Sequence, residues 1–121
     1  MKEPLIYISC SYNSANSWVR ERSIREAEYE SYLTWQNGAI AICPYLTTKF
    51  FYDLFPEETI FNGFIEIMLR CDAVYMCNYW EGSKESTTER KIALEHRIPV
   101  LYNLEDRKSF ISTWNPPTDL V

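Results

Sequence analysis

Glycine, histidine and long apolar runs are all scarce in this sequence. The chain of 121 residues holds three glycines and one histidine. No uninterrupted apolar stretch approaches the roughly 18 residues that a membrane-spanning helix requires. The N-terminus, Met1–Pro4, leads into a short apolar run without the apolar stretch of a signal peptide. We therefore expect a soluble, cytoplasmic protein with no membrane partner.

A basic excess is also missing. The 12 lysines and arginines are outnumbered by 17 aspartates and glutamates, which gives a formal net charge of −5. Proteins that bind the phosphate backbone of nucleic acids need a basic patch or stripe, so we expect no nucleic-acid polymer as a partner. Apolar residues make up 46% of the chain, which excludes disorder, and the length suits one domain, residues 1–121.

Metal-binding spacings are absent as well. No C-x-x-C pair occurs and His96 is the one histidine, so we expect no zinc site and no cofactor. The widely separated cysteines are Cys10, Cys43, Cys71 and Cys77. We interpret them as reduced thiols that are at least partly buried in the core. A nucleophilic pair of one cysteine with His96 is the less favoured alternative.

Apolar runs and helical patterns alternate along the chain. Runs rich in β-branched and aromatic residues predict strands at residues 5–10, 39–43, 73–77 and 98–102. Helices are predicted at residues 18–37, 57–71 and 86–96, with Gly38 after the first and Pro56 opening the second. Residues 44–55 and the tail are predicted to be irregular. This alternation is typical of an α/β fold: a single doubly wound (Rossmann- or flavodoxin-like) domain with a parallel sheet of four to five strands and helices on both faces.

The first predicted helix is expected to bury one stripe and expose its charges. The stripe consists of Ile24, Ala27, Ser31 and Trp35, which recur at helical spacing. The charged residues Arg20, Glu21, Arg22, Glu28 and Glu30 are interpreted as a solvent-exposed face of this helix.

Polar and aromatic residues follow the predicted strands at their carboxyl ends. Ligands of open parallel sheets bind at that edge, so these residues should gather around one cleft. They are Ser9, Ser11, Tyr12 and Asn13 after the first strand, Pro44 and Tyr45 after the second, and Asn78, Tyr79, Trp80, Glu81, Ser83, Ser86 and Glu89 after the third. Hydroxyls and carboxylates bind sugar hydroxyls, and aromatic rings stack on a base. The set therefore predicts a small-molecule nucleoside or nucleotide as the partner.

The glycine-rich phosphate-binding motifs are missing, since neither G-x-G-x-x-G nor the P-loop pattern occurs. The Ser/Thr-rich segment that leads into the third helix offers another way to bind one phosphate, because the N–H groups at a helix start attract anions. Ser83 and Ser86 would add hydroxyl groups there.

Several of these residues have a structural alternative. Ser86-Thr87-Thr88-Glu89 fits a capping box, in which Glu89 would accept a hydrogen bond from the backbone N–H of Ser86. Asp72 lies at the amino end of its strand, away from the predicted cleft, which favours a structural role. Tyr7 is expected to lie at least partly in the core. Trp80 is a large ring in a loop, which is more typical of a residue that covers a ligand.

From about Leu5 to Tyr102 the chain resembles the nucleoside 2-deoxyribosyltransferase-like superfamily, most of all its small phage and bacterial branches of uncharacterised members. The segments that carry the resemblance are Tyr7-Ile8-Ser9, Gly38 with Ile42-Cys43-Pro44, Cys71-Asp72-Ala73-Val74-Tyr75, and Trp80-Glu81-x-Ser83-x₅-Glu89-x₃-Ala93. The part from Cys71 to Ala93 is the most specific.

The resemblance implies roles for three residues. In characterised relatives a glutamate near the start of a helix attacks C1′ of a nucleoside and displaces the base; some members transfer the deoxyribose and others hydrolyse nucleoside monophosphates. Glu89 matches this glutamate, Tyr7 a tyrosine that orients it, and Ser83 a position that contacts phosphate. A carboxylate can capture an oxocarbenium-like centre covalently, as in retaining glycosidases, which supports Glu89 on chemical grounds.

Two departures from the family pattern keep the function open. The transferases carry an aspartate that helps to protonate the departing base, and Phe64 stands at that position, eight residues before Asp72. The usual glycines of the phosphate loop are replaced by Glu85 and Thr87. The chain is thus either an N-glycosidase or transferase acting on a nucleotide or nucleoside, or a phage-type binding protein that sequesters or cleaves a nucleotide immune signal similar to ADP-ribose.

Apolar residues surround most of the predicted helix 57–71, more than one sheet face can bury. Tyr29, Tyr32 and Leu33 lie outside the core stripe of the first helix. We therefore expect a homo-oligomer, a dimer or higher, with these helices at the contact.

Overall fold

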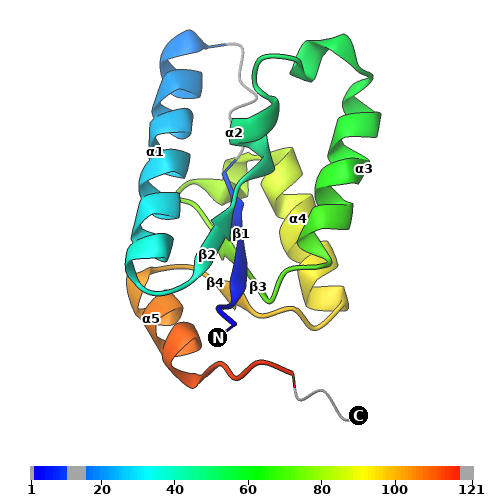
Figure 1. The fold of residues 1–121 in the computed structure, drawn as a ribbon. Helices are drawn as coiled ribbons and strands as arrows, with labels where there is room; N and C mark the ends of the chain where they lie inside the picture. Colours follow the sequence, from blue (N-terminus) through cyan, green and yellow to red (C-terminus); the bar gives the residue numbers. More distant parts are fainter. Residues whose placement is uncertain (1, 11–15, 118–121) are drawn as a thin grey trace.

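The computed structural model describes residues 2–10 and 16–117 (Figure 1). Its strands are β1 (Leu5–Ser9), β2 (Ile40–Ile42), β3 (Ala73–Met76) and β4 (Val100–Leu101). Its helices are α1 (Ser17–Gln36), α2 (Pro44–Thr48), α3 (Glu57–Met68), α4 (Lys84–Glu95) and α5 (Leu104–Thr113), with single 3₁₀ turns at η1 (Tyr52–Leu54) and η2 (Trp80–Gly82).

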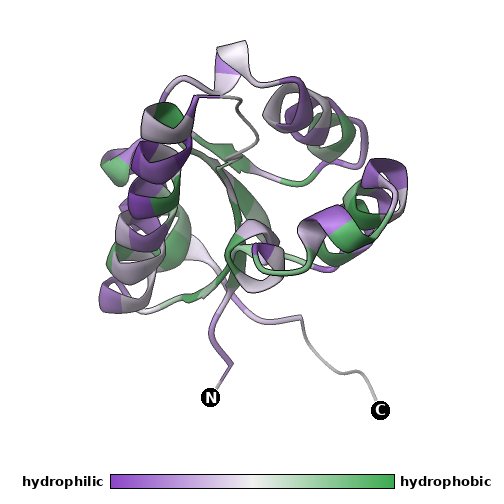
Figure 2. Ribbon diagram, turned by 90° about the horizontal axis from the view of Figure 1, so that it is seen from above, coloured by the Kyte–Doolittle hydropathy of each residue, from purple (hydrophilic) through white to green (hydrophobic). Residues whose placement is uncertain are grey.

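The strands form one parallel sheet in the order β2-β1-β3-β4. α1 and α5 cover one face of the sheet, and α3 and α4 cover the other (Figure 1). Seen from above, apolar residues gather on the strands between the helical layers, and polar residues lie on the outer helix surfaces (Figure 2). The predicted small, doubly wound α/β domain is confirmed, with four strands in the part of the chain that the structure describes.

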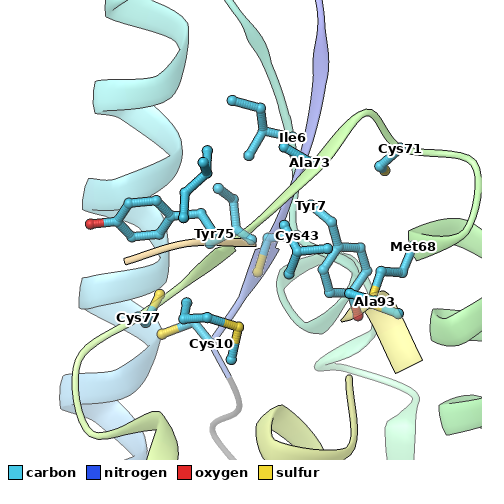
Figure 3. Packing of buried hydrophobic residues seen from close by; sticks show 14 of the residues in the cluster. Ile6, Tyr7, Cys10, Cys43, Met68, Cys71, Ala73, Tyr75, Cys77 and Ala93 are labelled. Atoms are coloured by element: carbon cyan, nitrogen blue, oxygen red, sulfur yellow. The ribbon is translucent and has the colours of Figure 1, made fainter. Parts of the chain in front are cut away.

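The two central strands form the middle of the core. Every residue of β3 is buried, and so is every residue of β1 except Leu5. Helices on both faces of the sheet explain why these strands are almost continuously apolar. All four cysteines belong to this core and are free thiols, as the sequence predicted (Figure 3).

The register between β1 and β3 decides which residues meet at the carboxyl edge of the sheet. Ser9 is aligned with Met76, and the backbone N–H of Cys77 donates to the carbonyl oxygen of Ser9 at 3.1 Å. Cys10 and Cys77 therefore leave the sheet side by side (Figure 3).

Two segments that were predicted to be irregular contain helices. Pro44 begins α2, a position where the missing N–H of proline costs no hydrogen bond. At α5 the side chain of Asn103 accepts a hydrogen bond from the N–H of Asp106 at 2.8 Å and caps the helix. The apolar pattern missed α5 because its one buried residue is Arg107.

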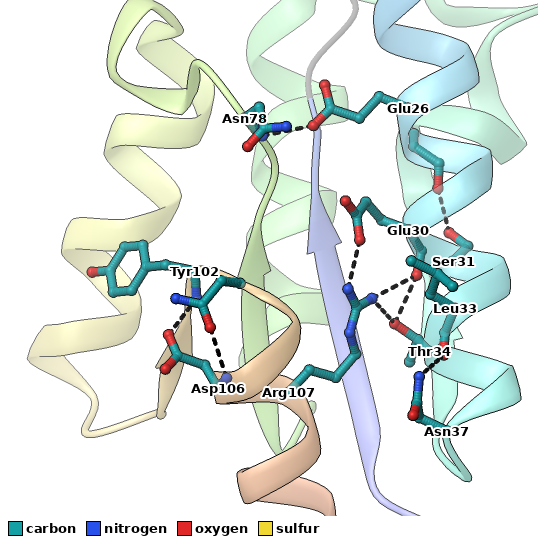
Figure 4. Close-up of polar contacts among 12 residues, drawn as sticks. Glu26, Glu30, Ser31, Leu33, Thr34, Asn37, Asn78, Tyr102, Asp106 and Arg107 are labelled. Carbon is teal, nitrogen blue, oxygen red and sulfur yellow. Dashed lines mark hydrogen bonds and ion pairs between the residues drawn. The ribbon is translucent and has the colours of Figure 1, made fainter.

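The core stripe of α1 was predicted only in part. Ala27 is buried, but Trp35 is 58% exposed. Glu30 and Thr34 are buried in its place, and Glu30 is not on a solvated face. Its carboxylate pairs with the guanidinium of Arg107 at 2.6 Å, as Figure 4 shows. The positive charge of Arg107, from the distant α5, thus offsets the cost of burying the Glu30 carboxylate.

A glycine and a proline mark two of the helix ends, as the sequence predicted. Gly38 adopts the left-handed conformation (φ +92°) after α1, which glycine tolerates without strain. Pro56 lies just before α3, and the helix ends at Met68, earlier than predicted. No helix among residues 2–10 and 16–117 is long and apolar enough to span a membrane.

Candidate functional site

A cavity of about 510 Å³ lies at the carboxyl edge of the sheet, where β1 and β3 end. One wall comes from the N-terminal half of α1 and another from η2 and the start of α4. The residues that line it are Ser9, Cys10, Val19, Arg22, Ser23, Glu26, Cys77, Asn78, Tyr79, Trp80, Gly82, Ser83, Lys84, Glu85 and Ser86. This is the edge at which an open parallel sheet is expected to bind its ligand.

A buried carboxylate lies directly behind the wall of this cavity. Glu89 is completely buried in α4. The hydroxyl of Tyr7 donates a hydrogen bond to one of its oxygens, and the hydroxyl of Ser9 donates to the other at 2.7 Å. Ser9 Oγ is also 3.0 Å from Ser86 Oγ. Because Ser9 and Ser86 line the cavity and Glu89 does not, the two serines separate the carboxylate from the open space.

Burial controls the protonation of this cluster. It raises the pKa of Glu89 to about 7, although the hydrogen bonds from Tyr7 and Ser9 act in the opposite direction. Burial, followed by the nearby charge of Glu89, raises the pKa of Tyr7 well above its ordinary value. Tyr7 therefore stays a hydroxyl donor, while Glu89 changes its charge near neutral pH.

The capping interpretation of Glu89 is wrong. α4 begins at Lys84, and its N-cap is Ser83, whose side chain accepts a hydrogen bond from the N–H of Ser86 at 3.1 Å. Glu89 therefore lies in the second turn, with its carboxylate directed at Tyr7 and Ser9 of β1. The helix starts earlier than predicted because Ser83, itself a favourable N-cap residue, supplies the cap three residues before Ser86.

Charges of both signs surround the cavity. Arg22 and Lys84 contribute positive charge, and Glu26 and Glu85 contribute negative charge. The amino end of α4 points its first N–H groups and its positive dipole end toward the same space. Arg22 is exposed, as predicted, and it also lines the cavity, with its guanidinium 5.7 Å from the ring of Tyr79.

Two aromatic residues, Tyr79 and Trp80, form a rim of the cavity, and other side chains of the protein already contact the ring of Trp80. Trp80 is half-buried, with the guanidinium of Arg90 over its ring at 4.9 Å and the ring of Tyr102 at 6.0 Å. Tyr79 is 78% exposed and has a left-handed backbone (φ 65°), which is unusual for a residue other than glycine. Such strained loops concentrate at functional sites.

The structure gathers most of the predicted site residues and separates a few. Ser9, Asn78, Trp80, Ser83 and Ser86 line the cavity, and Tyr7 and Glu89 lie behind it. Ser11, Tyr12 and Asn13 lie outside the described residues. Three predicted residues do not line the cavity. Pro44 and Tyr45 are buried, and Tyr45 lies near enough to Glu89 to feel its charge. Glu81 lines a neighbouring hollow.

Two positions noted in the sequence have structural roles. Asp72 accepts a hydrogen bond from the N–H of Leu5 at 2.8 Å at the amino edge of the sheet, which confirms its predicted structural role. Phe64 is buried and packs edge-on against Tyr45 at 4.5 Å. At the position where the transferases that the sequence resembles carry an acid, the chain therefore carries an apolar contact.

One group of residues at the cavity was not predicted. Cys10, Glu26 and Cys77 come from three elements, and their Sγ and carboxylate oxygen atoms all lie within 4.8 Å of one another. The backbone N–H of Asn78 donates to Glu26 at 2.7 Å, and burial raises the pKa of this carboxyl. The absence of a C-x-x-C pair argued against a metal site. The register of β1 and β3, however, places Cys10 and Cys77 close together although they are 67 residues apart in the chain.

These features define a small doubly wound α/β protein with a ligand-sized cavity at the carboxyl edge of its sheet and a buried carboxylate behind it. Residues 24–102 match the model of the family described as domain of unknown function DUF4406. Since the match covers more than half of the chain, the protein belongs to this family. No curated protein and no solved structure matches the chain.

Proposed function

We propose that the protein binds a nucleotide or nucleoside in this cavity and cleaves its N-glycosidic bond, with Glu89 as the nucleophile. One observation carries the proposal: a completely buried carboxylate is held by the hydroxyls of Tyr7 and Ser9 at the ligand-binding edge of the sheet. A buried carboxylate with a raised pKa beside a cavity is a feature of functional sites. The sequence resemblance to the nucleoside 2-deoxyribosyltransferase-like superfamily supports the same residue.

The proposed reaction has two steps. An oxygen of ionised Glu89 forms a bond to C1′ of the sugar while the C1′–N bond breaks, and the electron pair leaves with the base, which takes a proton from water. Water then attacks C1′, the sugar–Glu89 bond breaks, the proton of that water passes to the solvent, and the carboxylate is restored. Without an acid at Phe64 the enzyme would lack one source of leaving-group protonation, so we expect slow turnover.

The cavity supplies contacts for the rest of the ligand. A phosphate would lie at the amino end of α4, near Ser83, Ser86 and Lys84. The base would stack on the rim formed by Tyr79 and Trp80. A ligand with a phosphate and an aromatic base matches both ends of the cavity.

A second candidate function is binding without cleavage, as in a phage-type protein that sequesters a nucleotide immune signal similar to ADP-ribose. A specific observation favours it. Glu89 does not line the cavity, and both of its oxygens already accept hydrogen bonds. Catalysis requires Ser9 and Ser86 to move aside when the ligand binds, whereas sequestration requires no such movement.

One experiment separates the two functions. The protein is incubated with nucleosides, nucleoside monophosphates and ADP-ribose, and bound and free ligands are identified by chromatography and mass spectrometry. Cleavage predicts free base, at a rate that rises as the pH passes about 7, where Glu89 ionises, and that falls by roughly a hundredfold or more in Glu89→Gln. Intact bound ligand supports sequestration. The absence of any bound ligand would reject both.

A further inference from the structure

The floor of the cavity holds three side chains that the proposed glycosidase chemistry does not use. Cys10 follows β1, Cys77 follows β3, and Glu26 lies in α1. We propose that Cys10, Glu26 and Cys77 bind a thiophilic divalent cation such as Zn²⁺ at the floor of the cavity. This inference is independent of the role of Glu89.

The distances suit this assignment. The three ligand atoms lie within 4.8 Å of one another. Zinc–sulfur bonds of about 2.3 Å and zinc–oxygen bonds of about 2.0–2.2 Å place the ligands of a tetrahedral ion about 3.5–3.8 Å apart. Each side chain therefore needs to move by only about 1 Å to close around the ion, a movement that rotation about side-chain bonds provides.

The backbone holds the two sulfur ligands in place. β1 and β3 are aligned in parallel at Ser9 and Met76, and the N–H of Cys77 is bonded to the carbonyl oxygen of Ser9. The next residue on each strand is therefore a cysteine, and the two thiols lie next to each other (Figure 3). A pair fixed by neighbouring strands loses little conformational freedom when it binds an ion.

The third ligand is also oriented. The N–H of Asn78 donates to Oε2 of Glu26 at 2.7 Å (Figure 4). This bond orients the carboxylate, in the way that second-shell hydrogen bonds orient the ligands of known sites. Arg22 lies one turn earlier in α1 and offsets part of the negative charge of two thiolates and one carboxylate.

The ligand set determines the kind of cation. Two sulfur ligands select Zn²⁺, Cd²⁺ or Co²⁺ over Mg²⁺ and Ca²⁺, which prefer oxygen. On binding, the two thiols release their protons to the solvent. Three protein ligands leave a fourth position directed at the cavity, which water or a ligand atom can occupy.

Titration with CoCl₂ tests the proposal. The full chain is kept reduced with a phosphine, and the thiolate-to-cobalt charge-transfer band and the visible bands of tetrahedral Co²⁺ are followed by absorbance. We expect both to saturate at one equivalent and to disappear when ZnCl₂ is added. Cys77→Ser removes one of the two thiolate ligands and should lower the charge-transfer intensity by about half or more. Glu26→Gln should weaken Co²⁺ binding by about tenfold or more.

The matched control is Cys71→Ser, since Cys71 is a buried thiol at the opposite edge of the sheet and donates to the carbonyl oxygen of Ile67. This variant should bind Co²⁺ like the wild type. Circular dichroism reports whether each variant is folded, and Glu26→Gln, a change at a half-buried side chain, decides the outcome if Cys77→Ser unfolds. The absence of the bands in the wild type, or wild-type binding by folded Cys77→Ser or by Glu26→Gln, would overturn the proposal.

Discussion

Glu89 is a carboxylate in a position where a small protein normally places an apolar side chain. It is completely buried, and its interactions come from hydroxyls and not from a cation: Tyr7 and Ser9 donate to it. Hydroxyl donors stabilise the ionised form less than an ion pair would, so burial dominates and the pKa rises to about 7. Such a residue makes the stability of the protein depend on pH.

The first prediction concerns this dependence. Between pH 4.5 and about 7 the folded protein keeps a proton on Glu89 that the unfolded chain has released. Stability from this residue is therefore greatest at low pH and is lost as the pH rises through that range, by about 3 kcal/mol in total, levelling off above pH 7. Urea denaturation from pH 5 to 8 measures it.

Glu89→Gln should remove this slope, because glutamine does not titrate. Glu26→Gln is the comparison: the pKa of Glu26 is also raised by burial, but this variant should keep the part of the slope that belongs to Glu89. An unchanged slope in Glu89→Gln would show that other groups cause it.

At the scale of elements, the start of α4 combines a structural and a binding role. Ser83 caps the helix, and its side chain also lines the cavity. Asn103 caps α5 in the same way but does not line the cavity. Replacing either cap should therefore affect helix stability, but only replacement of Ser83 should affect ligand binding.

We predict that Ser83→Ala and Asn103→Ala each lower the free energy of unfolding by about 1 kcal/mol. Only Ser83→Ala should also reduce the preference for a nucleoside monophosphate over the matching nucleoside, because it removes a hydroxyl at the phosphate position. Calorimetry with the ligand pair and thermal melts of both variants measure these effects. Equal affinities for the two ligands in the wild type would mean that α4 is capped but binds no phosphate.

α5 is attached to α1 by a buried ion pair. Arg107 contacts the Glu30 carboxylate and carbonyl oxygen and the hydroxyl of Thr34, and its guanidinium lies 4.2 Å from the centre of the Tyr75 ring. These contacts explain why a helix with one buried residue is held against the domain.

We predict that Arg107→Met destabilises the fold by about 3–5 kcal/mol, because it leaves the Glu30 carboxylate buried without a cation. Adding Glu30→Gln should recover part of this loss. The control is Arg25→Met, which breaks an exposed pair with Glu21 and should change stability by less than about 1 kcal/mol. Urea denaturation compares the three variants with the wild type, and similar losses at both arginines would contradict the role of the buried pair.

At the scale of the whole molecule, part of the exposed apolar surface lies on α1, where Tyr29 and Tyr32 are each 58% exposed, as the sequence predicted. α3 buries Phe64 and Met68 and leaves Ile67 only 38% exposed. The most exposed apolar side chains before α3 are Phe50 at 92% and Leu54 at 79%, with Phe51 and Phe55 beside them. Apolar patches of this kind mark interaction surfaces.

We predict that the protein forms a dimer or higher homo-oligomer through this segment. Light scattering at tens of micromolar should give a mass above that of one chain. The double variant Phe50→Glu with Leu54→Glu should be monomeric and melt as a folded protein, since neither side chain belongs to the core. A monomeric wild type would contradict the prediction. The control Lys108→Glu, at an exposed lysine of α5 outside this segment, should keep the oligomer.

Local sequence was enough to predict the four strands, the three longest helices, the parallel sheet and most of the residues that gather at its carboxyl edge. It was enough because these features depend on neighbours in the chain: apolar runs such as Leu5–Ser9, a glycine after α1, and polar residues where strands end. The resemblance, and not spacing, joined Tyr7 to Glu89, and the structure brings their side chains into contact.

Contacts between residues far apart in the chain could not be predicted from local sequence. Arg107 reaches Glu30 across 77 residues, and strand register places Cys10 beside Cys77 and near Glu26. The helix α5 was missed because its one buried side chain is charged, and the α4 cap because two start signals compete within one turn. Local patterns report the periodicity of burial, but the partner that makes a buried charge or thiol stable comes from the order and register of the sheet.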